Sequence, residues 1–203
     1  MLLVKLKKSR KKRMEALENC CAKLYTKACF IYRKVNTALR DNDQTKLHTL
    51  GPYCFLVFNY IGHNLDNNFS IRQYFPEKFR LNKSKLVTVF RGDYISHEML
   101  QEYRQAAGDN TKHFKWLPFI STSREQNIAE DFAQNALYII QIECDASNDQ
   151  YVDLSTVSWY REEKEILLQP GVRFRVIKVE FDDTNGIYLI YIIIVRSYVS
   201  ILR

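Results

Sequence analysis

The sequence has few cysteines, glycines and prolines, and it has no apolar run long enough to cross a membrane. Its 203 residues include five cysteines, six glycines and four prolines. An odd number of cysteines without a CxxC spacing argues against a disulfide framework or a zinc site, and it fits reduced thiols. The most apolar stretch, residues 187–195, has nine residues, where a transmembrane helix needs about 20. We therefore predict no membrane span and interpret this stretch as a buried strand.

Two further absences concern localisation and metals. The apolar run at residues 1–4 is shorter than the roughly 7–15 residues of a signal-peptide core. We therefore expect an intracellular protein. The four histidines are scattered along the chain, at His48, His63, His97 and His113, and we predict no metal site.

Positive charge is concentrated near the N-terminus. The formal net charge is +7, from 30 Lys and Arg against 23 Asp and Glu. Seven basic residues without an acidic one precede position 14: Lys5, Lys7, Lys8, Arg10, Lys11, Lys12 and Arg13. Because the remainder of the chain is formally neutral, we predict a flexible basic tail over residues 1–13 and a single domain over residues 14–203. We expect no nucleic-acid partner for this domain.

Hydrophobic spacing predicts that the first part of the domain is helical. Apolar residues recur every three or four positions over residues 17–39, which predicts one long helix. A second helix is predicted over residues 47–61, although Gly51-Pro52 should break or restart it. The polar residues 64–68 are interpreted as a loop. The helical lobe is therefore expected to cover residues 14–80.

From residue 81 onward the pattern is that of a β-rich core. Extended or apolar runs occur at residues 86–90, 114–122, 137–144, 172–177 and 187–195. Two short helices are predicted among them, one over residues 96–107 and one after Ser123 that includes Phe132 and Ala136. The Asn-Gly turn at residues 185–186 predicts an antiparallel hairpin. The fold class is therefore α+β, with a helical lobe packed on a mainly antiparallel β half.

Three short segments carry residues suited to chemistry, and the first is Arg91-Gly92 at the end of a predicted strand. Arginine can donate two hydrogen bonds to a phosphate or a carboxylate, and glycine lets the backbone approach a flat ligand. A surface salt bridge followed by a turn would give the same pattern.

The second segment is Ser121-Thr122-Ser123. Its hydroxyls can hold a carboxylate in position, or they can form a polar strand end that caps the next helix. Phe132 lies eleven residues past Ser121, where it is either a helix core residue or a ring that stacks on a ligand.

The third segment contains two carboxylates, Glu163 and Glu165. Because they are two residues apart, they point to the same face where the backbone is extended. Placing two carboxylates beside an apolar strand costs free energy unless they are solvated, paired with a positive group, or needed for binding or catalysis. A solvated acidic loop is an alternative for this segment.

Taken in chain order, the three segments resemble the R-S-E signature of arginine-specific mono-ADP-ribosyltransferases. This family includes the vertebrate ecto-ADP-ribosyltransferases and the cholera-like and binary clostridial toxins. The residues that match are Arg91 for the R, Ser121-Thr122-Ser123 for the S-T-S and Glu163-Lys164-Glu165 for the E-x-E. Tyr160 completes the family's loop motif, an aromatic residue followed by x-x-(Gln or Glu)-x-Glu. The helical lobe resembles the Y-x-x-x-N-x-x-L-R of the ectoenzymes, through Tyr32, Asn36, Leu39 and Arg40.

The resemblance implies a β-sandwich-like core that binds NAD as a co-substrate, without a metal. Such enzymes split the bond between nicotinamide and ribose. In this chain Glu165 would be the catalytic carboxylate, Ser121 would orient it, and Arg91 would hold the pyrophosphate or the adjacent ribose. Gly92 would offer its backbone to the nicotinamide amide, and Phe132 would stack on the nicotinamide ring.

The resemblance also implies an acceptor. In the family a Glu at the position of Glu163 accompanies arginine acceptors and a Gln accompanies asparagine. A carboxylate suits arginine because a guanidinium stays protonated at pH 7. Tyr160 would contact the target protein, and Arg161 would assist the phosphates. Arg124, on a predicted capping turn, is interpreted as solvated.

The leading prediction is therefore NAD-dependent transfer of ADP-ribose to arginine side chains of a protein acceptor. Two alternatives stay open. A NAD glycohydrolase would transfer ADP-ribose to water instead. A non-enzymatic binding module would use the basic residues 1–13 to bind nucleic acid or an acidic membrane.

Overall fold

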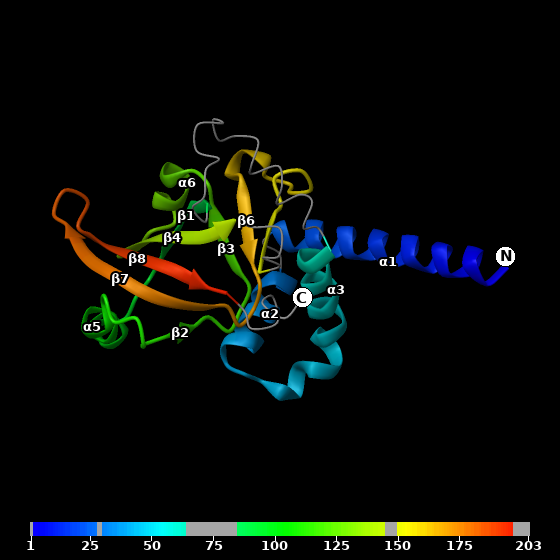
Figure 1. Cartoon of the computed structure of the whole chain (residues 1–203), viewed down its shortest axis with the longest axis horizontal. Helices are drawn as coiled ribbons and strands as arrows, with labels where there is room; N and C mark the ends of the chain where they lie inside the picture. Colours follow the sequence, from blue (N-terminus) through cyan, green and yellow to red (C-terminus); the bar gives the residue numbers. More distant parts are fainter. Residues whose placement is uncertain (1, 28–29, 64–84, 145–149, 197–203) are drawn as a thin grey trace.

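Helices form one side of the molecule and a β-sheet forms the other (Figure 1). The computed structural model describes residues 2–27, 30–63, 85–144 and 150–196. The helical side consists of α1 (Leu2–Thr26), α2 (Phe30–Arg40), the 3-10 helix η1 (Gln44–Lys46) and α3 (Leu47–His63). The loop expected at residues 64–68 and the end of the expected helical lobe lie outside the described residues.

The prediction of one long helix over residues 17–39 is wrong, because helix α1 ends at Thr26 and a second helix, α2, begins at Phe30. At the end of α1 the Thr26 hydroxyl donates a hydrogen bond to the Lys23 carbonyl at 2.8 Å. Beyond the break, Tyr32 contacts Tyr25 edge to face, with ring centroids 4.9 Å apart. On a continuous helix, residues seven positions apart are separated by about 10 Å along the axis. The interruption between the two helices therefore brings the two tyrosine rings into contact, whereas a single straight helix would keep them apart.

The predicted break at Gly51-Pro52 is also wrong, because α3 continues through both residues. Pro52 removes one helical hydrogen bond, the one that its missing N–H would donate to the His48 carbonyl. That loss is offset by packing on the following turns, where Val57 and Ile61 are fully buried. Tertiary packing thus outweighs the local preference of the sequence.

The basic residues near the N-terminus are helical and belong to α1, whereas a flexible tail was predicted for them. Residues 2–26 contain neither glycine nor proline, and lysine and arginine are good helix formers. On this helix Lys11 and Glu15 form an exposed i,i+4 ion pair of 3.8 Å. The first half of α1 extends away from the rest of the molecule (Figure 1). The expected boundary at residue 14 therefore lies inside a helix.

Within the described residues, the β half is an eight-stranded sheet with the order β2-β7-β8-β4-β1-β3-β6-β5. Its strands are β1 (Lys85–Asp93), β2 (Phe114–Lys115), β3 (Ile120–Ser123), β4 (Ala136–Cys144), β5 (Tyr151–Asp153), β6 (Glu165–Leu168), β7 (Arg173–Asp182) and β8 (Ile187–Val195). All neighbouring pairs in this sheet are antiparallel except β4 and β8, which are parallel. The predicted α+β class with a mainly antiparallel β half is confirmed.

The two faces of β6 contact different cores. Ile166 and Leu168 belong to a cluster with buried residues of β4, β7, β8 and the helix α5 (His97–Ala106). Leu167 points the other way and clusters with Tyr25, Val57 and other residues of the helical side. In Figure 1, β3 and β6 run at a steep angle to β7 and β8. The twisted sheet thus encloses one core in a sandwich-like manner, and the helices cover its outer face.

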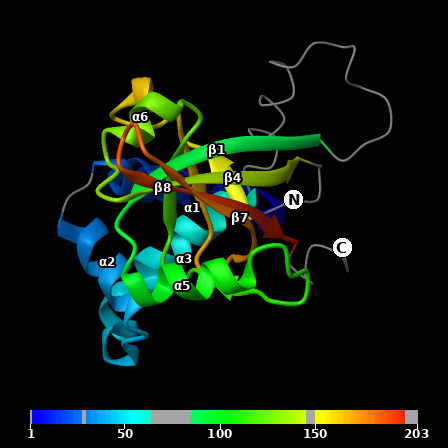
Figure 2. The same ribbon diagram turned by 90° about the vertical axis from the view of Figure 1, so that its left-hand side faces the viewer.

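Several elements of the β half follow the predictions from sequence. Helix α5 has Ser96 as its N-cap and is followed by Gly108, whose φ is 80°. Strands β7 and β8 form the expected hairpin, with Gly186 at a φ of 67°. Residues 187–195 form a strand in which buried positions alternate with partly exposed ones. Helix α6 lies near the top of the view in Figure 2 and α5 near its bottom.

The helix predicted after Ser123 is shorter than expected. Helix α6 covers Gln126–Glu130, so Phe132 lies beyond its end and Ala136 begins β4. The Ser123 hydroxyl accepts the N–H of Glu125 at 2.9 Å and donates to a carbonyl of the loop before β6. It therefore connects two segments of the site instead of closing a capping box. Within the described ranges, every helix is too short or too polar to cross a bilayer.

Candidate active site

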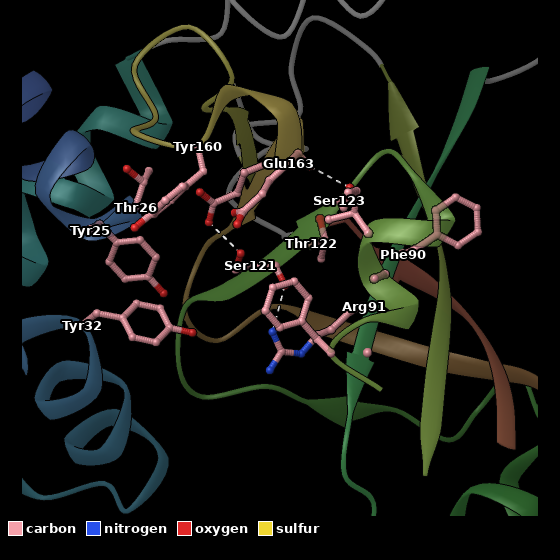
Figure 3. A pocket seen from close by; sticks show the side chains of 15 residues that line it. Tyr25, Thr26, Tyr32, Phe90, Arg91, Ser121, Thr122, Ser123, Tyr160 and Glu163 are labelled. Carbon is pink, nitrogen blue, oxygen red and sulfur yellow. Dashed lines mark hydrogen bonds between the residues drawn. The ribbon is translucent and has the colours of Figure 1, made fainter. Parts of the chain in front are cut away.

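A pocket of about 360 Å³ opens between the helical side and strands β1, β3 and β6. Figure 3 shows Tyr25, Thr26 and Tyr32 on the helical side and Arg91 and Ser121 on the strand side. The site residues predicted from sequence that line this pocket are Arg91, Gly92, Ser121, Phe132, Tyr160, Glu163 and Glu165. The fold thus brings together three segments that are far apart in the chain.

Glu165 and Ser121 form the central contact of the pocket. In the antiparallel pair of β3 and β6, Ser121 is opposite Leu167 and Ser123 is opposite Glu165. Ser121 and Glu165 are therefore diagonal neighbours on one face. The Ser121 hydroxyl donates to Oε1 of Glu165 at 2.6 Å, a distance typical of a charged acceptor. This contact supports the predicted positioning of Glu165 by Ser121.

The environment of Glu165 disfavours its ionised form. Glu165 is only 4% exposed, and this burial raises its pKa to about 7. The negative charge of Glu163 adds to the rise in pKa, whereas the hydrogen bond from Ser121 opposes it. A reaction that needs the Glu165 carboxylate is therefore expected to speed up as the pH rises through about 7.

Replacing Ser121 by alanine is expected to move the acidic limb of the kcat/KM profile about one unit to higher pH. The substitution removes the hydrogen bond that lowers the pKa of Glu165, so less carboxylate is present at a given pH. Ser121→Thr keeps a hydroxyl and is expected to keep the wild-type profile. Rates of the NAD cleavage that the resemblance implies, measured across the pH range, give the shift. An unmoved limb in the alanine variant would contradict the positioning role of Ser121.

Glu163 lines the pocket, but the backbone around it is not the extended one considered from the sequence. It ends the 3-10 helix η3 (Arg161–Glu163), and the next residue, Lys164, has a left-handed backbone with φ 45°. The condition for strand alternation, an extended backbone through both carboxylates, is not met, because Glu163 ends η3 and only Glu165 lies in a strand. The Ser123 hydroxyl holds the loop by donating to the Glu163 carbonyl at 2.7 Å. Partial burial raises the pKa of Glu163, and the Glu162 charge adds to this rise.

Arg91 is fixed in the wall of the pocket by three hydrogen bonds. Its Nε and Nη2 donate to Oδ2 of Asp93 at 2.9 and 2.7 Å, and its Nη1 donates to the Ser121 carbonyl at 2.8 Å. A guanidinium has five N–H groups, so two remain for an anionic ligand. Asp93 was not predicted from the sequence. Its position two residues after Arg91 on a strand is the signal that places both side chains on one face.

Gly92 lies where the end of α6 and the segment after it cross β1. A Cβ at this position would lie 2.1 Å from the Ala129 carbonyl oxygen and 2.4 Å from the Ala133 nitrogen. The glycine is therefore required by the packing of this segment, in addition to the backbone approach to a ligand that the sequence suggests.

Replacing Gly92 by alanine is expected to lower the free energy of unfolding by about 2 kcal/mol, because the added methyl group has no space. Gly62→Ala is the matched control, since a Cβ at Gly62 would meet nothing within 4 Å. Gly62 is in α3, where alanine is the better helix former, so this variant is expected to be at least as stable as wild type. Thermal unfolding measures both. Equal midpoints for wild type and Gly92→Ala would contradict the packing argument.

The structure also places the remaining residues that the sequence singled out. Phe132 and Tyr160 line the pocket and are 60% and 43% exposed. Arg161 is exposed and does not line it. The interpretation of Arg124 as solvated is wrong, because its side chain is only 20% exposed and its Nη2 pairs with Asp153. Asp153 is buried, and a buried carboxylate needs such a partner.

Tyr32 and Asn36 were matched to a motif of the helical lobe, but a helical wall of the pocket was not predicted from the sequence. Tyr25 is 1% exposed, and its hydroxyl accepts a hydrogen bond from Nδ2 of Asn36 at 2.8 Å. Thr26 and Tyr32 complete this wall. A polar Asn36 on the apolar face of α2 is the signal that could have indicated a buried hydroxyl partner. In the part of the chain that the structure describes, no group of three or more His, Cys, Asp or Glu could hold a metal ion.

The chain matches the family model of the ADP-ribosyltransferase exoenzymes over residues 6–193. The chain belongs to this family. No curated protein sequence matches it. The ADP-ribosyltransferase resemblance seen in the sequence is thereby confirmed.

Solved structures of ADP-ribosyltransferases share the fold. The Vis toxin of Vibrio splendidus in complex with agmatine aligns with a TM-score of 0.63 and 18% identity, over 90% of this chain and 75% of that one. Exoenzyme S from Pseudomonas aeruginosa, bound to human 14-3-3 protein beta and carba-NAD, gives 0.58 and 19%, over 87% and 72%. The C3 exoenzyme of Clostridium limosum gives 0.60 and 14%, over 88% and 85%. The predicted fold is therefore confirmed.

As a member of this family the protein is an NAD-dependent ADP-ribosyltransferase, with NAD as its co-substrate. The pocket suits such a ligand. Its volume is within the range of small-molecule sites. Arg91 keeps two N–H groups for a phosphate oxygen, and the exposed ring of Phe132 is free to stack on a flat base.

Proposed function

We propose that this ADP-ribosyltransferase modifies the arginine side chains of protein acceptors. The observation that carries the proposal is a pair of carboxylates with different environments in one pocket. Glu165 is buried, and Glu163 is partly exposed on the loop beside it. One carboxylate is thus suited to the ribose and the other to an incoming cation.

In the proposed reaction the bond between the nicotinamide nitrogen and ribose C1′ breaks, and nicotinamide leaves with the bonding electrons. The ribose becomes oxocarbenium-like, as in glycoside cleavage. Glu165, oriented by Ser121, accepts a hydrogen bond from the ribose 2′-hydroxyl and stabilises the positive charge. Arg91 holds the pyrophosphate or the adjacent ribose, and Gly92 and Phe132 hold the nicotinamide end.

A guanidinium nitrogen of the acceptor then bonds to C1′ and loses a proton. Glu163 attracts the cation and accepts this proton, because a guanidinium does not deprotonate by itself near pH 7. Partial burial raises the pKa of Glu163, which makes it a stronger base than an ordinary carboxylate. Tyr160 forms the edge of the loop that contacts the target protein. Arg161 does not line the pocket, and we assign it no contact with NAD.

Incubation with NAD and agmatine tests the proposal. Agmatine is a small guanidinium compound, and the similar Vis structure was solved with it. We expect mass spectrometry to detect ADP-ribosyl-agmatine in amounts equal to the nicotinamide released. Free ADP-ribose without the adduct would identify a NAD glycohydrolase.

A further inference from the structure

An exposed tryptophan lies at the rim of the pocket. Trp159 is 54% exposed, and it directly precedes Tyr160, which lines the pocket. Its backbone N–H donates to the Thr26 hydroxyl at 3.2 Å, and Thr26 also lines the pocket. This hydrogen bond attaches Trp159 to the end of α1.

Two lysines of the same helix end lie over the indole ring. The Nζ of Lys23 is 4.5 Å from the ring centroid of Trp159, and that of Lys27 is 5.3 Å from it. Both lysines are exposed, and neither forms an ion pair with another described residue. Cations within about 6 Å of an aromatic centroid are attracted to the face of the ring. The tryptophan therefore holds two positive charges at the rim that no described residue neutralises in an ion pair.

The charge changes sign along the same loop. Glu162 is exposed and Glu163 lines the pocket, so the loop is negative on the side of η3. Arg161 adds one exposed positive charge between Trp159 and the two carboxylates. The rim thus offers a cationic, aromatic surface followed by an anionic entrance.

We propose that Lys23, Lys27 and Trp159 form a docking surface for a protein acceptor whose target arginine has an acidic and an apolar residue nearby in sequence. The proposal rests on the proposed transfer to arginine and concerns which arginines are modified. The acidic residue of the acceptor pairs with the lysines, the apolar side chain covers Trp159, and the guanidinium enters toward Glu163. Tryptophans at interfaces contribute strongly to affinity once a partner covers them. Opposite charges at the rim fix the register of the partner.

Synthetic peptides with a single arginine provide the probe. One series carries a leucine and a glutamate at increasing distances from the arginine, and a second series carries lysine in place of the glutamate. We expect the KM of the best glutamate peptide to be about tenfold lower than that of its lysine counterpart, with similar kcat. The difference is expected to shrink in about 0.5 M salt, because exposed charges are screened.

Charge reversal tests whether Lys23 and Lys27 cause the preference for the glutamate peptides. The double substitution Lys23→Glu and Lys27→Glu is expected to reverse the preference between the two series. Lys8→Glu with Lys12→Glu is the matched control, since both residues are exposed, four positions apart on α1, and about 16 Å or more from Lys23 along the helix axis. The control is expected to keep the wild-type preference.

Substitution of Trp159 tests the apolar part of the surface. Trp159→Ala is expected to raise the KM for the leucine peptides about fivefold, and Trp159→Phe is expected to keep most of the affinity. All variants are expected to modify agmatine at the wild-type rate, because agmatine has no side chain that reaches this surface.

The outcomes separate the two proposals. Failure of the wild-type protein to modify agmatine would overturn the transfer to arginine itself. Normal modification of agmatine, with a KM for peptides that does not depend on the glutamate, would overturn the docking surface alone. An equal effect of the Lys8 and Lys12 substitutions would also overturn it, since the preference would then follow net charge.

Discussion

Replacing Glu165 by glutamine is expected to lower kcat for nicotinamide release from NAD about a thousandfold. Glutamine has nearly the same shape and can still accept the hydrogen bond from Ser121, so the substitution removes mainly the negative charge. In the proposed mechanism that charge matters because the cationic ribose forms in a buried site, where water screens electrostatic interactions poorly. Single-turnover and steady-state measurements of nicotinamide release give the change in rate.

Glu162→Gln is the matched control for this loss of charge, because Glu162 is exposed on the same loop. It is expected to keep the wild-type kcat. An unchanged kcat in Glu165→Gln would contradict the assigned role of Glu165.

Stability distinguishes a lost charge from a damaged fold. The folded protein raises the pKa of Glu165 to about 7, above its ordinary value, so the protonated form favours folding. This stabilisation is complete at low pH and is lost as the pH rises through about 7. Glu165→Gln is therefore expected to unfold at a higher temperature than wild type at pH 8, and the difference is expected to shrink below pH 5. A lower midpoint at both pH values would indicate disruption of the fold.

Replacing Glu163 by glutamine is expected to reduce the modification of agmatine by at least about a hundredfold in kcat/KM. Glutamine neither attracts the guanidinium electrostatically nor accepts its proton. Cleavage of NAD is expected to continue, because the contact between Ser121 and Glu165 does not involve the side chain of Glu163. The products therefore shift from ADP-ribosyl-agmatine to free ADP-ribose, which chromatography separates.

Glu162→Gln again provides the control, because it removes a neighbouring charge that does not line the pocket. Full-rate modification of agmatine by Glu163→Gln would contradict the proposed role of Glu163. Loss of both products would show that Glu163 is needed for NAD cleavage as well.

The elements that were predictable from sequence are those in which local signals and tertiary packing agree. Helix α5 has a serine cap and a glycine after its end, and the β7–β8 hairpin has an Asn-Gly turn. The predictions failed where packing outweighed local preference. Pro52 is tolerated inside α3 because the following turns of the helix are buried. Helix α1 ends at Thr26 although the helical spacing of apolar residues continues beyond it.

The strand side of the pocket was visible in the sequence. Arg91, Ser121 and Glu165 stand at or near strand ends in a characteristic order, and strand pairing then places them on one wall. These three residues could be recognised from the sequence because residue type and spacing within a single segment are local properties of the chain.

By itself the sequence determined the α+β class and the family resemblance, and it singled out Glu165 as the candidate catalytic carboxylate. Only the tertiary structure decided that Asp93 holds Arg91, that a left-handed Lys164 turns Glu163 into the pocket, and that helices provide the facing wall. It also decided the pKa of Glu165, because burial determines how strongly the charged form is disfavoured. These properties arise from contacts between residues distant in sequence, and no local pattern encodes the distances at which such residues meet.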